Sequence, residues 1–478
     1  MKVCVLQPDY STTGVDYKNY DPPRDLSVLI PEAEVHNIFL NKLTTYKQLK
    51  ELGKQGYDVF VNLCEGYLEW EVPSIDVMYT LELLNLPFTG PTTKLYDPPK
   101  ELMKYLAYCE GVKTPGYVLI EKKEDTEQAI KHISFPLFVK PAKAGDSLGV
   151  DQHSLVGTKE ELQQKVNNII EEYGPLLVEE YIAGREFTVL VAANTDEKTC
   201  TVFRPVEYIF PAGKEFKTYA LKTSELHPDC NIPCNDPELD KQLRSATEKI
   251  FKGINGVGYA RLDFRVNDKN EIFFLEINFT CSVFYKDGYE GSADFILKYD
   301  GIGQAGFLLH IINEGICRHQ RRKKLFVMKG NSIAGFGIYA SRNINEGDII
   351  FKGEERAQRF VTKRYVENNW NEDEKMHFRR YAYPVSAELF ALWEEDPSGW
   401  APQNHSCNPN TAFDGLNVVA IKKIAKGQEL TLDYADFLDE NMEPFKCQCG
   451  SSSCRGEISG TVANSLTLRE QNLLRLND

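Results

Sequence analysis

The sequence predicts an α/β (α+β) region followed by a smaller β-rich region, and three observations predict that order. At 478 residues the chain is too long for one hydrophobic core, because cores stop growing at roughly 250–300 residues. Up to about Gly315, short apolar runs alternate with amphipathic stretches, which is typical of α/β architecture with a largely parallel or mixed sheet. After a basic run at 318–324, short strand-like pieces are separated by Gly, Asn and Asp, which favours a compact β-rich domain.

Individual elements follow from the spacing of apolar residues. The runs expected to be strands in the first region are Val3–Leu6, Val59–Asn62, Val118–Ile120 and Leu137–Val139. Helical spacing marks Ser74–Leu84 and Thr158–Tyr173. In the second region we expect a helical insertion over roughly 355–395, with helices at Arg359–Asn369 and Ser386–Trp393.

Composition and charge exclude several classes of protein. With 42% hydrophobic and 26% charged residues, the composition is that of a soluble globular chain. No run approaches the roughly 18 apolar residues of a membrane span, and the first residues, Met1 to Gln7, are too abruptly polar for a signal peptide. We therefore expect an intracellular, cytoplasmic protein, with the nucleus left open. The net charge of −15 argues against direct binding of nucleic acid, and the basic run at 318–324 is interpreted as a solvated linker.

Two features of the first region suit the binding of a nucleotide. Lys140 ends an apolar run and precedes a small, Gly-containing loop that reaches Gly149. A strand-end lysine can hold a phosphate, and backbone N–H groups of the loop can close over it, although the spacing is not that of a Walker A motif. Glu179 and Glu186 flank a turn at Ala183-Gly184, where carboxylates can accept from an adenine amino group or ribose hydroxyls. Taken alone, the second feature is better explained as a hairpin with surface acids.

A third feature is an acidic set on two apolar runs. Glu276 and Asn278 are two residues apart and share one strand face, and Arg261 likewise shares a face with Asp263. Carboxylates in apolar surroundings need a partner. Mg²⁺ that bridges nucleotide phosphates is a suitable partner, because it binds a few carboxylates together with phosphate oxygens.

The three features in this order resemble the ATP-grasp superfamily, and within it the D-alanine–D-alanine ligase group, over about residues 1–315. The resemblance implies ATP held by Lys104, Lys140, Glu179 and Glu186, and Mg²⁺ held by Asp263, Glu276 and Asn278. It also implies that Arg261 faces an acyl-phosphate and that Lys222 belongs to a catalytic loop. Two segments depart from the group, Phe279–Tyr285 after the metal-binding Asn and Leu63–Gly66 in the N-terminal region. D-alanine is therefore not assumed as the substrate.

The cysteines near the end of the second region indicate a metal. Cys447, Cys449 and Cys454 form a CxCxxxxC cluster, and Cys407 lies in the run Asn404-His405-Ser-Cys407. Four clustered cysteines in an intracellular chain predict a tetrahedral Zn²⁺ site rather than free thiols.

These cysteines, together with Gly335-Phe336-Gly337, Asn404-His405 and Glu429–Tyr434, resemble a SET domain with its post-SET zinc loop. The resemblance implies S-adenosylmethionine bound by Gly335, Phe336, Gly337, Asn404 and His405, with Tyr434 as the active-site tyrosine. For His405, a purely structural hydrogen-bonding role is equally supported. Phe351 stands where many SET domains have Tyr, and Leu432 occupies a position that is often Phe or Tyr. The absence of a hydroxyl there allows multiple methylation.

Together, these motifs and resemblances predict an α/β (α+β) ATP-grasp fold followed by a β-rich SET domain with a helical insertion and a zinc-bound post-SET loop. The expected boundaries are 1–96 for an N-terminal α/β domain, 97–317 for the ATP-grasp domain, 318–324 for the linker, 325–440 for the SET domain, 441–456 for the zinc loop and 457–478 for a tail. We expect a bifunctional enzyme: an ATP-dependent carboxylate–amine ligase acting on amino acids or peptides, and an N-methyltransferase acting on a lysine-bearing protein or small molecule. The alternatives are a protein lysine methyltransferase with an ATP-grasp scaffold, and a non-catalytic relic.

Overall fold

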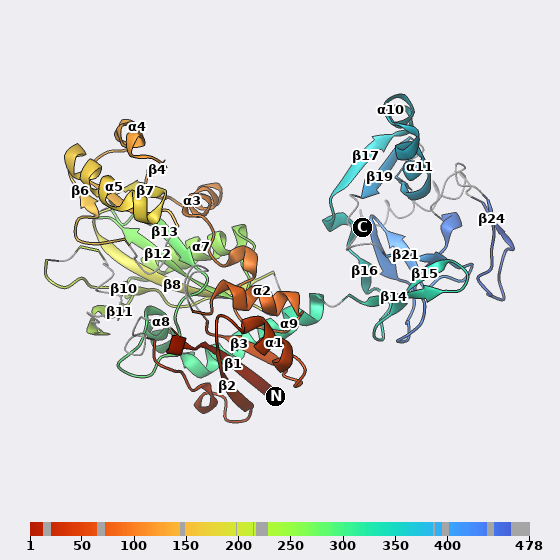
Figure 1. Ribbon diagram of the computed structural model, residues 1–478, viewed down its shortest axis with the longest axis horizontal. Helices are drawn as coiled ribbons and strands as arrows, with labels where there is room; N and C mark the ends of the chain where they lie inside the picture. Colours follow the sequence, from red (N-terminus) through yellow and green to blue (C-terminus); the bar gives the residue numbers. More distant parts are fainter. Residues whose placement is uncertain are drawn as a thin grey trace. The chain divides into compact units, whose positions relative to one another are not determined.

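The strands and helices belong to two units, Met1–Arg322 and Lys323–Asp478 (Figure 1). The computed structural model describes residues 1–12, 21–64, 72–143, 149–196, 198–213, 215–216, 228–322, 324–385, 388–393, 401–436 and 444–459. Among these residues, no helix combines the length and the apolar composition that a bilayer crossing requires.

The described strands of the first unit form three sheets. One is parallel, with strand order β2-β1-β3, and the other two are antiparallel, with orders β4-β7-β5-β6 and β11-β10-β8-β12-β13, where β9 also pairs with β8. The strands are β1 (Lys2–Pro8), β2 (Glu34–Leu40), β3 (Val59–Asn62), β4 (Tyr117–Ile120), β5 (Leu137–Pro141), β6 (Leu155–Val156), β7 (Leu176–Glu180), β8 (Arg185–Ala193), β9 (Cys200–Val202), β10 (Val206–Tyr208), β11 (Asn231–Pro233), β12 (Tyr259–Val266) and β13 (Ile272–Asn278). Among the described residues of the first unit, the expected parallel pairing is found at the N-terminus, whereas the later strands pair with antiparallel neighbours.

Helices separate these strands, and the elements expected from periodicity are confirmed. All four expected strands lie within β1, β3, β4 and β5, and the two expected helices are α2 and α5. The helices are α1 (Thr45–Leu52), α2 (Ile75–Leu83), α3 (Lys100–Cys109), α4 (Thr126–His132), α5 (Lys159–Tyr173), α7 (Pro237–Gly253), α8 (Ser292–Asp300) and α9 (Gly303–Arg322).

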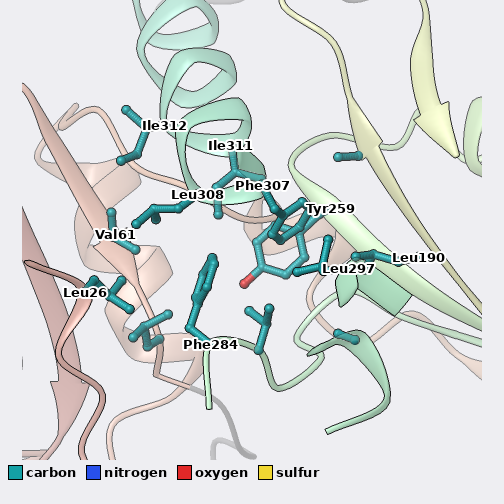
Figure 2. Packing of buried hydrophobic residues seen from close by; sticks show 14 of the residues in the cluster. Leu26, Val61, Leu190, Tyr259, Phe284, Leu297, Phe307, Leu308, Ile311 and Ile312 are labelled. Carbon is teal, nitrogen blue, oxygen red and sulfur yellow. The ribbon is translucent and has the colours of Figure 1, made fainter. Parts of the chain in front are cut away.

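The largest hydrophobic core of the first unit combines residues from the beginning and from the end of that unit's sequence. Phe307 and Ile311 of α9 pack with Val61 of β3 and with Phe284, which lies in the turn after β13 (Figure 2). Each of these four side chains is at most 4% exposed. The turn that follows the expected metal-binding residues is therefore part of a hydrophobic core and not a free surface loop.

The linker expected at 318–324 is wrong for its first residues, which are helical. Residues up to Arg322 form the end of α9, and Arg318 is buried, with 3% exposure. Its guanidinium donates to the carbonyls of Gly90 and Phe88 and lies 3.3 Å from Glu314. The charge pattern alone indicated a solvated face, but buried carbonyls and a carboxylate supply the partners that an internal arginine needs.

The second unit is built from short strands. Its strands are β14 (Phe326–Asn331), β15 (Gly335–Ala340), β16 (Ile349–Phe351), β17 (Gln358–Thr362), β18 (Tyr383–Pro384), β19 (Leu389–Trp393), β20 (Asn404–His405), β21 (Thr411–Asp414), β22 (Asn417–Ala420), β23 (Thr431–Leu432), β24 (Phe445–Lys446) and β25 (Glu457–Ile458). They form small sheets, β14-β15, β16-β22-β21, β17-β19-β18, β20-β23 and β24-β25. The β-rich character expected for this region is confirmed.

The insertion within the second unit is only partly helical. It contains α10 (Lys363–Asn369) and α11 (Glu372–Tyr381), packed on β17 and β19 through Val366, Phe378 and Phe390 (Figure 1). The helix expected at Ser386–Trp393 is wrong, because residues 389–393 form β19 between β17 and β18. A short apolar run fits either element, and here cross-strand pairing decides.

Candidate functional sites

Two buried lysines of the first unit share one carboxylate. Lys140 lies near the end of β5, Glu179 on the adjacent β7, and Lys104 on the buried face of α3. Lys104 Nζ lies 2.7 Å from Glu179 Oε2, and Lys140 Nζ lies 2.6 Å from Glu179 Oε1. Burial alone would raise the pKa of the Glu179 carboxyl, but the two lysine charges outweigh it and hold this pKa below its usual range. A phosphate could replace Glu179 as the partner of both lysines.

Lys100 adds a third cation that sequence reasoning missed. It lies one helical turn before Lys104 on α3, is 6% exposed, and places its Nζ 3.9 Å from Glu276 Oε2. The i,i+4 spacing of two lysines on one helix was the available signal, because such residues share a helix face.

The polar side chains of β12 and β13 lie on one face of the strand pair, as the alternation of polar and apolar residues indicated. In the antiparallel pair β12 and β13, Asp263 lies opposite Glu276 and Arg261 lies opposite Asn278. Apolar residues between them are buried, and these four side chains line the half-buried face. Oxygen-bearing side chains from two adjacent strands fit a Mg²⁺ ion.

Local contacts hold these acids in place. Arg261 Nη2 lies 3.2 Å from Asp263 Oδ2, and Thr188 donates to Asp263 Oδ1 at 2.8 Å. The Asn278 amide donates to Glu276 Oε1 at 3.5 Å. The structure therefore places one guanidinium directly beside the candidate metal ligands.

Glu186 is paired with Arg265, which the sequence analysis did not identify as part of the site. Arg265 Nε lies 3.3 Å from Glu186 Oε2, and the same guanidinium donates to the carbonyls of Gly184 and Glu215. Gly184 has φ +133°, and a Cβ there would collide with the Val266 carbonyl. The hairpin turn therefore needs glycine. Arg265 lies two residues beyond Asp263 on the same strand, which was the only sequence signal for it.

Two expected parts of this site lie outside the described residues: Lys222 and the loop residues 144–148. The departing segment Leu63–Gly66 is described only through Cys64.

The departing turn Phe279–Tyr285 is anchored by buried polar groups. Asp294 accepts from the backbone N–H groups of Phe284 and Gly291 and from the Gln304 amide. Burial raises the pKa of Asp294 to about 6, against the effect of these hydrogen bonds. Arg24 donates to the Val283 carbonyl at 3.2 Å. These contacts, which the sequence did not reveal, fix a turn that contributes bulky buried side chains.

In the second unit, the glycine motif lies against Asn404 and Glu429. The amide nitrogen of Asn404 donates to Glu429 Oε1 at 2.7 Å and to the Phe336 carbonyl at 3.0 Å. A Cβ on Gly337 would lie 2.9 Å from that amide nitrogen and would collide with Glu429 Oε1. Glycine at this position therefore leaves room for the side chains of Asn404 and Glu429 against the strand. Glu429 belongs to the motif Glu429–Tyr434, but the sequence analysis assigned it no role of its own. Gly335 has φ +81°, a backbone conformation that favours glycine.

Hydrogen bonds hold both the hydroxyl and the backbone of Tyr434. Its hydroxyl donates to the Gln403 carbonyl at 2.7 Å, and its backbone N–H donates to His405 Nδ1 at 3.1 Å. Burial raises the pKa of the Tyr434 phenol to about 12, so the group stays protonated at neutral pH. Parallel pairing of β20 with β23 brings the two segments together, with His405 opposite Leu432.

The four cysteines converge as their spacing indicated. The sulfur atoms of Cys407, Cys447, Cys449 and Cys454 all lie within 4.8 Å of one another, and Cys407 and Cys447 are 3.8 Å apart. Tetrahedral zinc with Zn–S bonds of about 2.3 Å requires sulfur atoms about 3.8 Å apart. Four thiols with this spacing fit Zn²⁺ without large movements.

Comparisons with known proteins place each unit in a class of enzyme. Residues 107–283 match the family described as D-ala D-ala ligase C-terminus, and residues 335–435 match the SET domain family. The chain therefore carries an ATP-grasp domain of the D-alanine–D-alanine ligase type followed by a SET domain. Both resemblances indicated by the motifs are confirmed, and both domains are of enzymatic types.

Individual relatives of the chain are D-alanine–D-alanine ligases. The D-alanine–D-alanine ligase of Bacillus pumilus is 29% identical over 257 residues, which span 51% of this chain and 68% of that protein. The corresponding ligase of Aquifex aeolicus is 30% identical over 200 residues, spanning 41% of this chain and 64% of that protein. The solved D-alanine–D-alanine ligase from Coxiella burnetii aligns with a TM-score of 0.49 at 20% identity, over 68% of this chain and 96% of that one.

Proposed function

We propose that the chain is a bifunctional enzyme, in which an ATP-dependent carboxylate–amine ligase is joined to an S-adenosylmethionine-dependent lysine N-methyltransferase. The ligase assignment is supported chiefly by one observation: α3 carries both Lys104, which contacts Glu179, and Lys100, which lies 3.9 Å from Glu276, so the lysine pair and the acidic set are neighbours. An intracellular location suits the free thiols of the candidate zinc site.

In the ligase reaction, ATP with Mg²⁺ supplies the phosphoryl group that activates the substrate carboxylate. Lys104 and Lys140 would neutralise phosphate charge, Glu186 would accept from the ribose, and Asp263, Glu276 and Asn278 would hold the metal. A carboxylate oxygen attacks the γ-phosphorus and ADP leaves. An amine nitrogen then attacks the acyl carbon, and phosphate and a proton leave. Arg261 would face the acyl-phosphate, so catalysis consists of positioning and charge neutralisation.

The metal assignment predicts the effect of Glu276→Ala. This variant should lose ATP-dependent product formation by roughly 10²- to 10³-fold, which is typical of removing one charge-stabilising group from an active site. Product formation is measured by mass spectrometry with ATP, Mg²⁺ and a pool of amino acids. Glu271→Ala is the matched control, because Glu271 precedes the same strand but pairs with Lys113 at the surface. Wild-type turnover in Glu276→Ala would refute the metal assignment.

In the methyl-transfer reaction, S-adenosylmethionine supplies the methyl group. The backbone of residues 335–337, Asn404 and His405 would hold it. The acceptor would be a lysine-bearing protein or a small amine, deprotonated so that its nitrogen can attack. Tyr434 would orient the acceptor through its fixed hydroxyl. Zinc bound by the four cysteines would order the post-SET segment without taking part in the chemistry.

The cofactor assignment predicts the effect of Gly337→Ala. The added methyl group would displace Glu429 and with it Asn404, so affinity for S-adenosylmethionine should fall roughly tenfold or more. Isothermal titration with S-adenosylmethionine measures this. Gly330→Ala on the paired strand is the control, because a Cβ there meets nothing within 4 Å. Equal affinities in the two variants would argue against the Gly337–Asn404 contact as part of the cofactor site.

A second candidate function is a lysine methyltransferase whose ATP-grasp domain is only a nucleotide-binding or docking scaffold. The buried turn Phe279–Tyr285 favours it, because this turn replaces the segment that follows the metal-binding Asn in the ligase group. Incubation with ATP, isotope-labelled S-adenosylmethionine and pooled amino acids distinguishes the two. A new amide product supports the bifunctional enzyme, whereas methylation with no ATP-dependent product supports the scaffold.

A further inference from the structure

We propose that His405 is a positioning residue that connects the zinc centre to Tyr434, with one ring nitrogen assigned to each. The inference rests on the zinc site proposed above. Nδ1 accepts from the Tyr434 backbone N–H at 3.1 Å, and Nε2 lies 3.4 Å from Cys407 Sγ. One imidazole thus contacts both a candidate zinc ligand and the backbone of the active-site tyrosine.

The ring is held in this position by packing. The His405 side chain is 4% exposed. Tyr434 and Phe445 lie edge-on against it, with ring centroids 5.6 and 5.7 Å away. These two rings restrict the space open to the imidazole.

The hydrogen bonds determine which nitrogen carries the proton. Because Nδ1 accepts from the Tyr434 N–H, it must be unprotonated, and the proton of the neutral ring is on Nε2, facing Cys407. Asp433 does not compete, since its Oδ1 is 3.6 Å from Nδ1 and already accepts from Arg455 and from the backbone N–H of Ala435.

The same N–H donor suits a metal-bound thiolate. Cys407 Sγ also accepts from the Arg455 backbone N–H at 3.4 Å, so two donors would share the negative charge of this ligand. Donors behind a metal ligand fix its orientation and strengthen metal binding. Because both ring nitrogens are used in this way, a contact of residue 405 with S-adenosylmethionine would have to come from its backbone.

Two variants distinguish the contributions of the two ring nitrogens of His405. His405→Asn keeps an acceptor near the Tyr434 N–H but removes the donor to Cys407, whereas His405→Gln keeps a donor near Cys407 but removes that acceptor. Zinc release to a chromogenic chelator should be roughly 10- to 100-fold faster in His405→Asn and unchanged in His405→Gln. Conversely, kcat for methyl transfer at saturating zinc should fall in His405→Gln with little change in KM. Wild-type zinc release in His405→Asn, or identical behaviour of both variants, would overturn the inference.

The wild-type chain provides the test if the variants do not fold. In a spectrum of the zinc-loaded chain with ¹⁵N-labelled histidine, His405 should carry its proton on Nε2. A proton on Nδ1 would overturn the inference. A purified wild-type chain that is active without zinc would instead refute the zinc site itself, so the two failures are distinguishable.

Discussion

Glu179→Gln is expected to destabilise the first unit by about 3–5 kcal/mol, because it leaves buried ammonium groups without their counter-ion. Lys104 is 1% and Lys140 9% exposed, and both contact this carboxylate. Removing the charge while keeping the side-chain shape isolates the electrostatic effect. The free energy of unfolding of the first unit, measured by denaturant titration, is the readout. ATP with Mg²⁺ should restore part of the lost stability, since phosphate would supply the missing negative charge.

Glu127→Gln is the matched control for this experiment. Its carboxylate lies 2.6 Å from Lys159, the same separation as Glu179 from Lys140, but it is at the surface. An exposed pair contributes little to stability because solvent screens its charges, so this substitution should change the free energy of unfolding far less than Glu179→Gln does. Equal effects of the two substitutions would show that the Glu179 cluster is solvated in solution.

The same cluster predicts how this effect depends on pH. Because the lysines lower the pKa of Glu179 below its ordinary 4.5 in the folded chain, its stabilising contribution is complete above that value. It is lost as the pH falls through the lowered folded pKa. The difference between the wild type and Glu179→Gln should therefore shrink only in acid below about pH 4.5.

Cys449→Ser is expected to abolish stoichiometric zinc binding and, with it, methyl transfer. Structural zinc sites contribute about 10–16 kcal/mol of binding energy that is also folding energy, so losing one thiolate should disorder the segment that contains Cys447 and Cys454. Elemental analysis should find one Zn²⁺ per wild-type chain and little in the variant.

Cys109→Ser is the control for the zinc prediction, because this exposed thiol lies on α3, in the first unit. It should leave both the zinc content and methyl transfer unchanged. ATP-dependent activity should persist in Cys449→Ser, since the cysteine cluster lies in the second unit. An active wild-type protein without zinc would contradict the zinc assignment.

The sequence by itself determined which chemical groups each site contains. Alternation placed Asp263, Glu276 and Asn278 on strand faces, and pairing of β12 with β13 brought them together. The CxCxxxxC spacing predicted the cluster of Cys447, Cys449 and Cys454, and the motif around Cys407 supplied the fourth thiol. Such features are local, because period-two alternation and short motifs depend only on neighbouring residues. For the same reason α2 and α5 were predicted nearly to their ends.

The tertiary structure alone decided which groups support these sites. Arg265 beside Glu186, Glu429 beside Asn404 and His405 beside Cys407 each involve a partner chosen by folding. It also decided that Arg318 is buried and that residues 389–393 form a strand. A charged or short apolar segment is compatible with several environments, and burial and pairing with distant residues select one of them. That selection is not encoded in the local pattern.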